Sequence, residues 1–147
     1  MEPMIQIHAL GIALSVVASF LLGMIWYSFL FNKAWKTEMQ IKDEDKLPPL
    51  MIVRSLGLNI LGTLIMVWVF SHEQAVWDAR TWGHPNNWIT DNAAAGLGAF
   101  FTWLGFYLPQ DLNKISFGNK SWKLFAIDTA YNFCSLLIVA FVLMKVK

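Results

Sequence analysis

The run IQIHALGIALSVVASFLLGMIWYSFLF, residues 5–31, decides the fold of this chain. It holds no Asp, Glu, Lys or Arg. It is also longer than the roughly 20 residues with which a helix crosses a hydrocarbon core of about 30 Å. A strand of a membrane barrel would be about 10 residues long and would alternate apolar with polar side chains. The run therefore predicts a membrane-spanning α-helix.

The composition of the whole chain also indicates that lipid surrounds the protein. Of its 147 residues, 56% are hydrophobic and 14% are charged, whereas a typical soluble domain has about 25% charged residues. The net charge of +1 provides no basic footprint for nucleic acid. The single cysteine, Cys134, excludes an intrachain disulfide. We therefore expect the lipid bilayer to be a partner of this protein and nucleic acid not to be one.

Three more stretches are apolar enough to cross a bilayer, at approximately residues 50–70, 91–109 and 122–144. Each is long enough for a helix, and a helix satisfies its own backbone hydrogen bonds inside lipid. Together with residues 5–31 they predict an all-α fold. The expected architecture is an integral membrane bundle of four transmembrane helices, which forms a single domain over residues 1–147.

The third stretch is short. We expect it to begin at a cap among residues 90–92 and to end or kink at Pro109, which cannot donate a backbone hydrogen bond. The segment 71–92 before it carries three spaced tryptophans. That pattern predicts a loop that lies in the membrane–water interface.

A short motif occurs twice, as Asn32-Lys33-Ala34-Trp35-Lys36 and as Asn119-Lys120-Ser121-Trp122-Lys123. Trp and Lys favour the interface, because each joins an apolar body to a polar end. The expected interface anchors are Trp26, Tyr27, Trp35 and Trp122. Two explanations stay open: the duplication of a helical hairpin, which would make the fold two related hairpins, or the independent reuse of interface chemistry.

The distribution of basic residues predicts the orientation, because cytoplasmic loops are enriched in Lys and Arg. The first and third loops and their edges hold Lys33, Lys36, Lys42, Lys46, Arg54, Lys114, Lys120 and Lys123. The opposite side holds Arg80, Lys145 and Lys147. We therefore expect a multi-pass protein of the cell membrane, in bacteria the inner membrane, with both termini on the non-cytoplasmic side.

Small residues recur along the predicted spans at helical spacing. They are Gly11, Ser15, Ser19 and Gly23 in the first span and Gly98 and Gly105 in the third. Helices associate in lipid through such faces, so close packing is the expected role. A pore lining is the alternative.

Two charged residues fall within predicted spans, Arg54 and Asp128. A charge at the bilayer centre costs about 2.5–3.5 kcal/mol on insertion scales, so such residues usually have a partner or a role. We predict an Arg54–Asp128 ion pair, with Asn132 and Asn59 completing an intramembrane polar network. The alternatives are that Arg54 reaches the headgroups and that the pair is purely structural.

Catalytic and metal-binding motifs are missing from the sequence. No nucleophile elbow, phosphate-binding loop or nucleotide fingerprint is present, so no catalytic residue and no cofactor is expected. The segment 71–92 contains His72, Glu73, Asp78 and His84, but their spacing does not suit metal ligands. We expect no metal.

Two groups of residues carry a family resemblance. The first runs from Gly23-Met24-Ile25-Trp26-Tyr27-Ser28 to Trp35, and the second comprises Trp103-Leu104-Gly105-Phe106, Pro109, the stretch 117–124 and Ile127-Asp128-Thr129-Ala130-Tyr131. These residues resemble the signature of small membrane proteins grouped as domain of unknown function 1761. Asn119-Lys120 stands where that family has an acidic residue and arginine, and Ala130 stands where glycine is common. The resemblance implies a four-helix membrane fold and no activity.

Three function classes remain. We expect a non-enzymatic bundle that acts as a homo-oligomer or as a small accessory subunit of a membrane complex, because small-residue faces and aromatic girdles occur without catalytic motifs. The alternative is a small proton-coupled transporter or channel that uses Asp128 and Arg54. A membrane enzyme would have only His72, Asp78 and His84 to work with.

Overall fold

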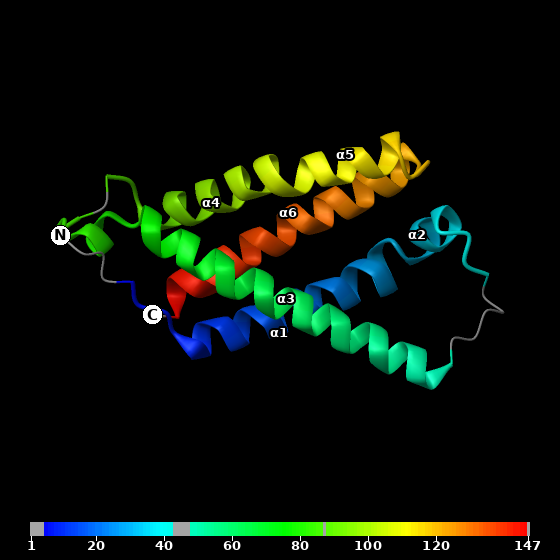
Figure 1. Ribbon diagram of the computed structural model, residues 1–147, viewed down its shortest axis with the longest axis horizontal. Helices are drawn as coiled ribbons and strands as arrows, with labels where there is room; N and C mark the ends of the chain where they lie inside the picture. The colour runs from blue at the N-terminus through cyan, green and yellow to red at the C-terminus, as the bar shows by residue number, and fades with distance from the viewer. Residues whose placement is uncertain (1–4, 43–47, 87, 147) are drawn as a thin grey trace.

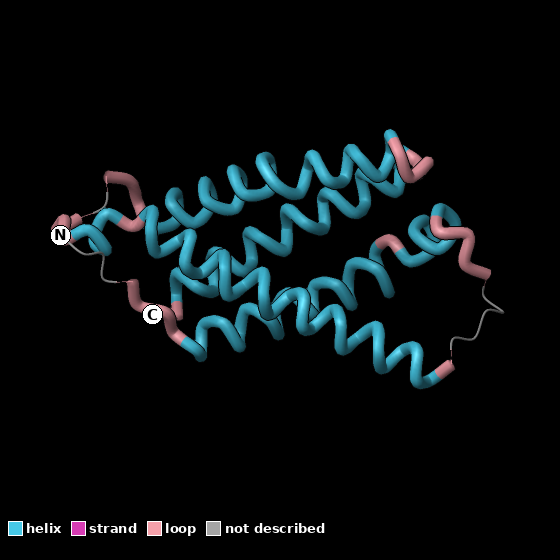
Figure 2. Tube along the Cα trace, in the orientation of Figure 1, coloured by secondary structure: helices cyan, strands magenta, loops and turns pink. Residues whose placement is uncertain are grey.

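The computed structural model describes residues 5–42, 48–86 and 88–146, and helices are the only regular elements in these ranges, which confirms the all-α class. Figures 1 and 2 show an elongated bundle with no strand in those ranges. The elements are α1 (Ala9–Ile25), η1 (Trp26–Leu30), α2 (Asn32–Glu38), α3 (Pro49–Trp77), η2 (Ala79–Trp82), α4 (Asp91–Thr102), η3 (Trp103–Tyr107), α5 (Leu108–Ser116) and α6 (Trp122–Lys145). Lys46 and Lys147, which the count of basic residues includes, lie outside the described residues.

Helix α6 is the axis of the bundle. It packs against α1 on one side and against α4 and α5 on the other, while α3 crosses α1 (Figure 1). Elements α4, η3 and α5 follow one another without a break and form one long rod beside α6. The two copies of the Lys-Trp motif lie at the same end of the molecule, at α2 and at the start of α6.

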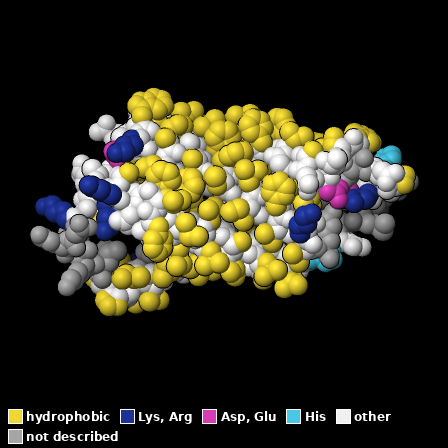
Figure 3. Space-filling view, turned by 180° about the vertical axis from the view of Figure 1, so that it is seen from behind, with side chains coloured by type: hydrophobic (Ala, Val, Ile, Leu, Met, Phe, Trp, Pro, Cys, Tyr) yellow, Lys and Arg dark blue, Asp and Glu magenta, His cyan; other side chains and the backbone are white. Residues whose placement is uncertain are grey.

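Three helical segments are long and apolar enough to cross a membrane, namely Ala9–Leu30, Pro49–Trp77 and Trp122–Lys145. The rod from α4 to α5 is not one of them. Apolar side chains cover the middle of the face seen in Figure 3, whereas the coloured charged side chains lie toward its two ends. This distribution suits a bundle with lipid around its middle.

Two helices are longer than the sequence predicts. Helix α3 continues to Trp77, although the three tryptophans of the segment 71–92 predict a loop from Ser71 onward. Residues 71–77 contain no Gly or Pro, so nothing in them breaks the helix. The third stretch continues past Pro109 to Ser116. The π turn η3 ends at Tyr107, two residues before the proline, and the N–H of Leu108 donates to the carbonyl of Trp103. A wider turn lets the helix pass a residue that has no N–H.

The buried core lies toward the end of the bundle where α3, α4 and α6 meet. It consists of Val67, Phe70, Ala95, Ala99, Leu136, Val139 and Ala140. Toward the other end α3 diverges from α5 and α6 (Figure 1), and every residue from Pro49 to Gly62 is exposed. The bundle is therefore closed at one end and open beside α3 at the other.

Candidate functional site

A cavity of 330 Å³ lies where α3 begins to diverge, between α1, α3, η3 and α6. We call it the central cavity. Its polar lining residues are Ser19, Asn59, Thr63, Tyr107, Tyr131, Asn132 and Ser135, and its apolar ones are Leu58, Gly62, Met66 and Leu136. None of these side chains is acidic or basic, so the cavity offers hydroxyl and amide groups without a charge.

Contacts between α1 and α6 build one wall of the central cavity. The hydroxyl oxygens of Ser19 and Ser135 lie 2.8 Å apart, both on buried residues. Gly23 leaves room for Tyr131, because a methyl group at this glycine would lie 3.1 Å from the tyrosine hydroxyl. The small residues of α1 therefore allow polar side chains of α6 to reach this wall.

Three polar side chains of the cavity have unused hydrogen-bonding capacity. Asn59, Thr63 and Tyr107 make no side-chain hydrogen bond within residues 5–42, 48–86 and 88–146. They come from α3 and from the π turn η3, on walls other than the one that Ser19 and Ser135 close. Two hydroxyl groups and one amide are thus available to a molecule in the cavity.

A buried carboxylate stands behind Asn132. The amide of Asn132 donates to Asp111 Oδ2 at 2.9 Å, and Lys114 Nζ lies 2.7 Å from Asp111 Oδ1. Asp111 is 2% exposed, whereas Lys114 reaches solvent with more than half of its side chain. Lys114 holds the Asp111 carboxylate in place, and the hydrogen bond to that carboxylate orients the amide of Asn132, which lines the cavity.

The structure does not join Arg54 to Asp128. Tyr27 donates its hydroxyl to Asp128 Oδ1 at 3.0 Å. Arg54 lies on the exposed half of α3 and makes no ion pair or hydrogen bond within the described ranges. Of the four residues of the predicted network, Asn59 and Asn132 share the central cavity, and the carboxylate beside them is that of Asp111.

Two tryptophans hold the part of α6 that contains Asp128. The indole of Trp26 donates to the carbonyl of Ile127 at 3.1 Å, and that of Trp103 donates to the carbonyl of Thr129 at 3.0 Å. Both tryptophans open π turns, η1 and η3. The first parts of the two family motifs thus meet at one segment of α6, which the spacing of the motifs does not reveal.

The remaining predicted residues have varied surroundings. A methyl group at Gly11 would lie 3.0 Å from the Val146 carbonyl oxygen and one at Gly98 would overlap the Gln74 amide, whereas one at Gly105 would meet nothing within 4 Å. Ser15 is fully buried, and its hydroxyl has no partner within the described part of the chain. Trp35 packs edge-on against Tyr27, with ring centroids 5.4 Å apart, and Trp122 is exposed.

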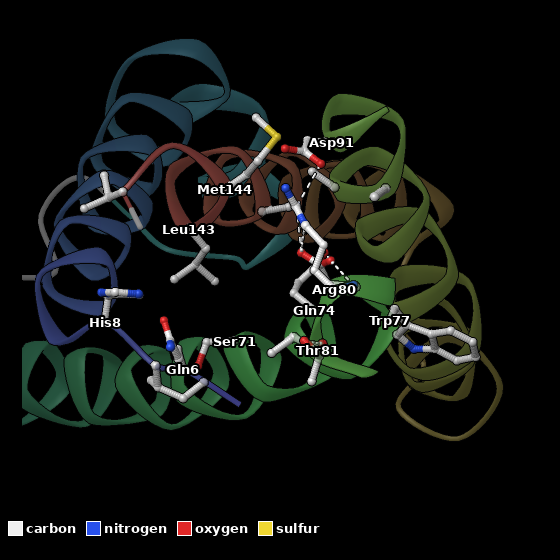
Figure 4. Close-up of a pocket in the computed structure, with 17 residues that line it drawn as sticks. Gln6, His8, Ser71, Gln74, Trp77, Arg80, Thr81, Asp91, Leu143 and Met144 are labelled. Atoms are coloured by element: carbon white, nitrogen blue, oxygen red, sulfur yellow. Dashed lines mark hydrogen bonds and ion pairs between the residues drawn. The ribbon is translucent and has the colours of Figure 1, made fainter. Parts of the chain in front are cut away.

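A second cavity, the end pocket, also of 330 Å³, lies at the closed end of the bundle (Figure 4). Gln6 and His8 approach it from the chain before α1, Gln74 from α3 and Leu143 from α6. At its edge Arg80 bridges two carboxylates, with Nη2 lying 2.7 Å from Asp78 and 2.9 Å from Asp91.

The charges at the edge of the end pocket neutralise one another in part. The hydrogen bonds that Arg80 donates to the Asp78 carboxylate hold the pKa of Arg80 above its usual range. The sequence marks these residues only as scattered charges in a tryptophan-containing segment, and the fold brings them together. No group of three or more His, Cys, Asp or Glu residues that could hold a metal ion occurs in the described ranges.

Comparison with known proteins identifies one family. The family model described as a protein of unknown function, DUF1761, matches residues 10–144, which is nearly the whole chain. No curated protein and no solved structure matches significantly. The central cavity lies within the matched residues, whereas the lining of the end pocket also includes Gln6, Ile7, His8 and Val146 outside them.

Proposed function

The chain belongs to the DUF1761 family, whose function is unknown, and we propose that it is a non-enzymatic membrane protein that passes small, uncharged polar solutes across the membrane by way of the central cavity. The rod from α4 to α5 is its fourth span, beside the three helices that are long and apolar enough. In this arrangement the open end of the bundle, with its lysines, faces the cytoplasm.

One observation carries this proposal. Thr63 and Tyr107, which are both half-buried, and Asn59, which is exposed, present unused polar groups to a cavity that has no charged lining residue. Polar groups shielded from water are costly unless they find a partner. A solute that donates and accepts hydrogen bonds supplies one, whereas an ion would enter this cavity without a compensating charge. The volume of 330 Å³ is at the lower end of the range for ligand pockets and suits a small molecule.

Osmotic shock of liposomes containing the protein tests the proposal, with urea and glycerol as uncharged probes and potassium chloride as the charged one. We expect light scattering to report faster entry of urea or glycerol than in protein-free liposomes, and no faster entry of the salt. Thr63→Val keeps the shape of the side chain and removes its hydroxyl. It should slow entry about two- to tenfold, the equivalent of one hydrogen bond of about 0.5–1.5 kcal/mol.

Ser55→Ala is the matched control, since Ser55 lies on the same helix but does not line the cavity. It should leave the rate unchanged. Rates equal to those of protein-free liposomes for both urea and glycerol would overturn the proposal. So would equal effects of Thr63→Val and Ser55→Ala.

A second candidate function is assembly, which the exposed half of α3 favours. Arg54 and Ser55 lie in the segment 49–62 of α3. Every residue of this segment is exposed, so no other helix of the described part of the chain buries it. A polar face inside lipid is stabilised by another helix. A second copy is the one partner whose presence in the same membrane is assured, so we expect α3 to pair with α3.

Single cysteines in a Cys134→Ala background test this pairing. Val53→Cys, on the exposed half of α3, should form disulfide-linked dimers in membranes, whereas Phe101→Cys on α4 should not. Dimers that form equally at both positions, or at neither, would contradict the assembly.

A further inference from the structure

The central cavity and the end pocket lie on opposite sides of a thin apolar layer. On α6, Leu136 lines the central cavity and Ala140 lines the end pocket. These residues are one helical turn apart, which is about 6 Å along the axis. On α3, Met66 lines the central cavity and Ser71 the end pocket. The two cavities are therefore separated by little more than one turn.

Three buried side chains from two helices lie in this layer. Val67 and Phe70 of α3 lie between the lining residues of that helix, and Val139 of α6 lies between those of the other. Val67 and Val139 are 0% exposed and Phe70 is 2% exposed. We call these three residues the plug. Dispersion and apolar burial hold it in place, and such contacts have no directional bond to break when a side chain rotates.

Two buried polar atoms beside the cavities lack partners. The Ser15 hydroxyl is one helical turn along α1 from Ser19 of the central cavity, and the Gln74 amide nitrogen belongs to a lining residue of the end pocket. Neither has a hydrogen bond within the described ranges. An unsatisfied buried polar group costs about 1–3 kcal/mol. Both atoms could hydrogen-bond to a molecule that moves between the two cavities.

We propose that the two cavities form one route for small, uncharged polar solutes across the membrane and that the plug, with Phe70 as its largest side chain, is the gate. This inference rests on the proposed function and extends it from the cavity that takes up the solute to the route that the solute follows and the gate on that route. In the end pocket Arg80 is held by Asp78 and Asp91, so Gln6, His8 and Gln74 are the groups that would receive the solute.

Thiol accessibility in membrane vesicles of both orientations tests the gate. In a Cys134→Ala background, Thr63→Cys reports on the central cavity and Ala75→Cys reports on the end pocket. A membrane-impermeant maleimide should label Thr63→Cys only from the side of the Lys-Trp motifs and Ala75→Cys only from the other side. Adding Phe70→Ala should make Thr63→Cys reactive from both sides.

The labelling of Thr63→Cys from the closed side should become about tenfold faster with Phe70→Ala. A tenfold shift of an open–closed equilibrium needs only about 1.4 kcal/mol, and the loss of a buried phenyl ring removes more than that. Phe70→Leu should increase the labelling rate of Thr63→Cys by a smaller factor. It serves as a second variant in case Phe70→Ala, which removes more of the side chain, misfolds. Phe101→Ala is the matched control, because this phenylalanine is 61% exposed and lines neither cavity.

The outcomes separate this inference from the function on which it rests. If Thr63→Cys is labelled from the side of the Lys-Trp motifs but neither Phe70→Ala nor Phe70→Leu opens it to the other side, the gate is wrong and the binding cavity stands. If Thr63→Cys is labelled from neither side, the central cavity is inaccessible and both proposals fail. Equal effects of Phe70→Ala and Phe101→Ala would also overturn the gate.

Discussion

Asp111 shows how the surroundings of a residue, rather than its position in the chain, decide its role. Its carboxylate is buried and receives both the Asn132 amide and the Lys114 ammonium group. The sequence assigns the important acid to Asp128, because Asp128 lies inside an apolar run. Asp111 lies three residues before Lys114 and looks like part of an exposed turn. Burial by neighbouring helices is not visible in the sequence at that position.

Asp111→Ala should lower the thermal unfolding midpoint of the protein in mild detergent. The change leaves the Asn132 amide without an acceptor, which costs about 1–3 kcal/mol. Asp111→Asn is the matched control, since its side-chain oxygen can still accept from Asn132, and it should lose less. Equal midpoints for the two variants would show that the contact between Asn132 and residue 111 does not stabilise the fold.

Asp128→Asn tests whether this acid takes part in solute passage. Asp128 does not line the central cavity, and its partner is Tyr27, which can also donate to the oxygen of an asparagine. We therefore expect urea and glycerol to enter liposomes at the wild-type rate, measured by light scattering as above. A rate as low as that of Thr63→Val would instead favour a transporter that depends on Asp128.

At the scale of the elements, the two π turns are the unexpected feature. Each begins with a tryptophan, Trp26 in η1 and Trp103 in η3, and each indole donates to a backbone carbonyl of α6. Each turn also contains a tyrosine that faces this region: Tyr27 in η1 donates to Asp128, and Tyr107 in η3 lines the central cavity. π turns are frequent at functional sites, which fits this arrangement.

Trp103→Phe should destabilise the bundle by about 0.5–1.5 kcal/mol, because it removes the indole donor and keeps most of the ring. The indole of Trp103 reaches both the carbonyl and the hydroxyl of Thr129. The matched control is Trp122→Phe, since Trp122 is 67% exposed. Thermal unfolding in mild detergent compares the two, and the idea fails if Trp122→Phe lowers the midpoint as much as Trp103→Phe does.

At the scale of the whole molecule, the path of the chain fixes the relation between its two ends. The start of α1 and the end of α6 lie together, with a methyl group at Gly11 reaching within 3.0 Å of the Val146 carbonyl. Four spans place both ends on the same side of a membrane, which permits this contact, whereas three spans would place them on opposite sides. The contact therefore favours the rod from α4 to α5 as a true span.

Reporters fused to each end in turn should give the same result. We expect an N-terminal and a C-terminal fusion of a reporter active only outside the cytoplasm to be equally active. A fusion after Lys120, in the connection between α5 and α6, should be inactive. Opposite results for the two ends would exclude four spans, and an inverted pattern would keep the four spans but reverse the orientation.

The sequence by itself determined the helical class, the approximate extents of the long helices and the family. These follow from local properties, because an apolar run of sufficient length forms a helix whatever lies beside it in lipid. The helix lengths expected from the sequence are too short at residues 71–77 and after Pro109. There the helix continues through local signals that usually mark a loop or an end.

Only the tertiary structure decided which polar side chains meet. A sequence places Arg54 and Asp128 at similar depths, but the rotation and divergence of α3 leave Arg54 exposed and bring Asn59 and Thr63 to the cavity instead. Helix rotation and crossing depend on how many side chains pack at once across several helices. No local sequence pattern encodes the combined effect of these packing contacts. The central cavity, the plug and the end pocket therefore become apparent only in the folded chain.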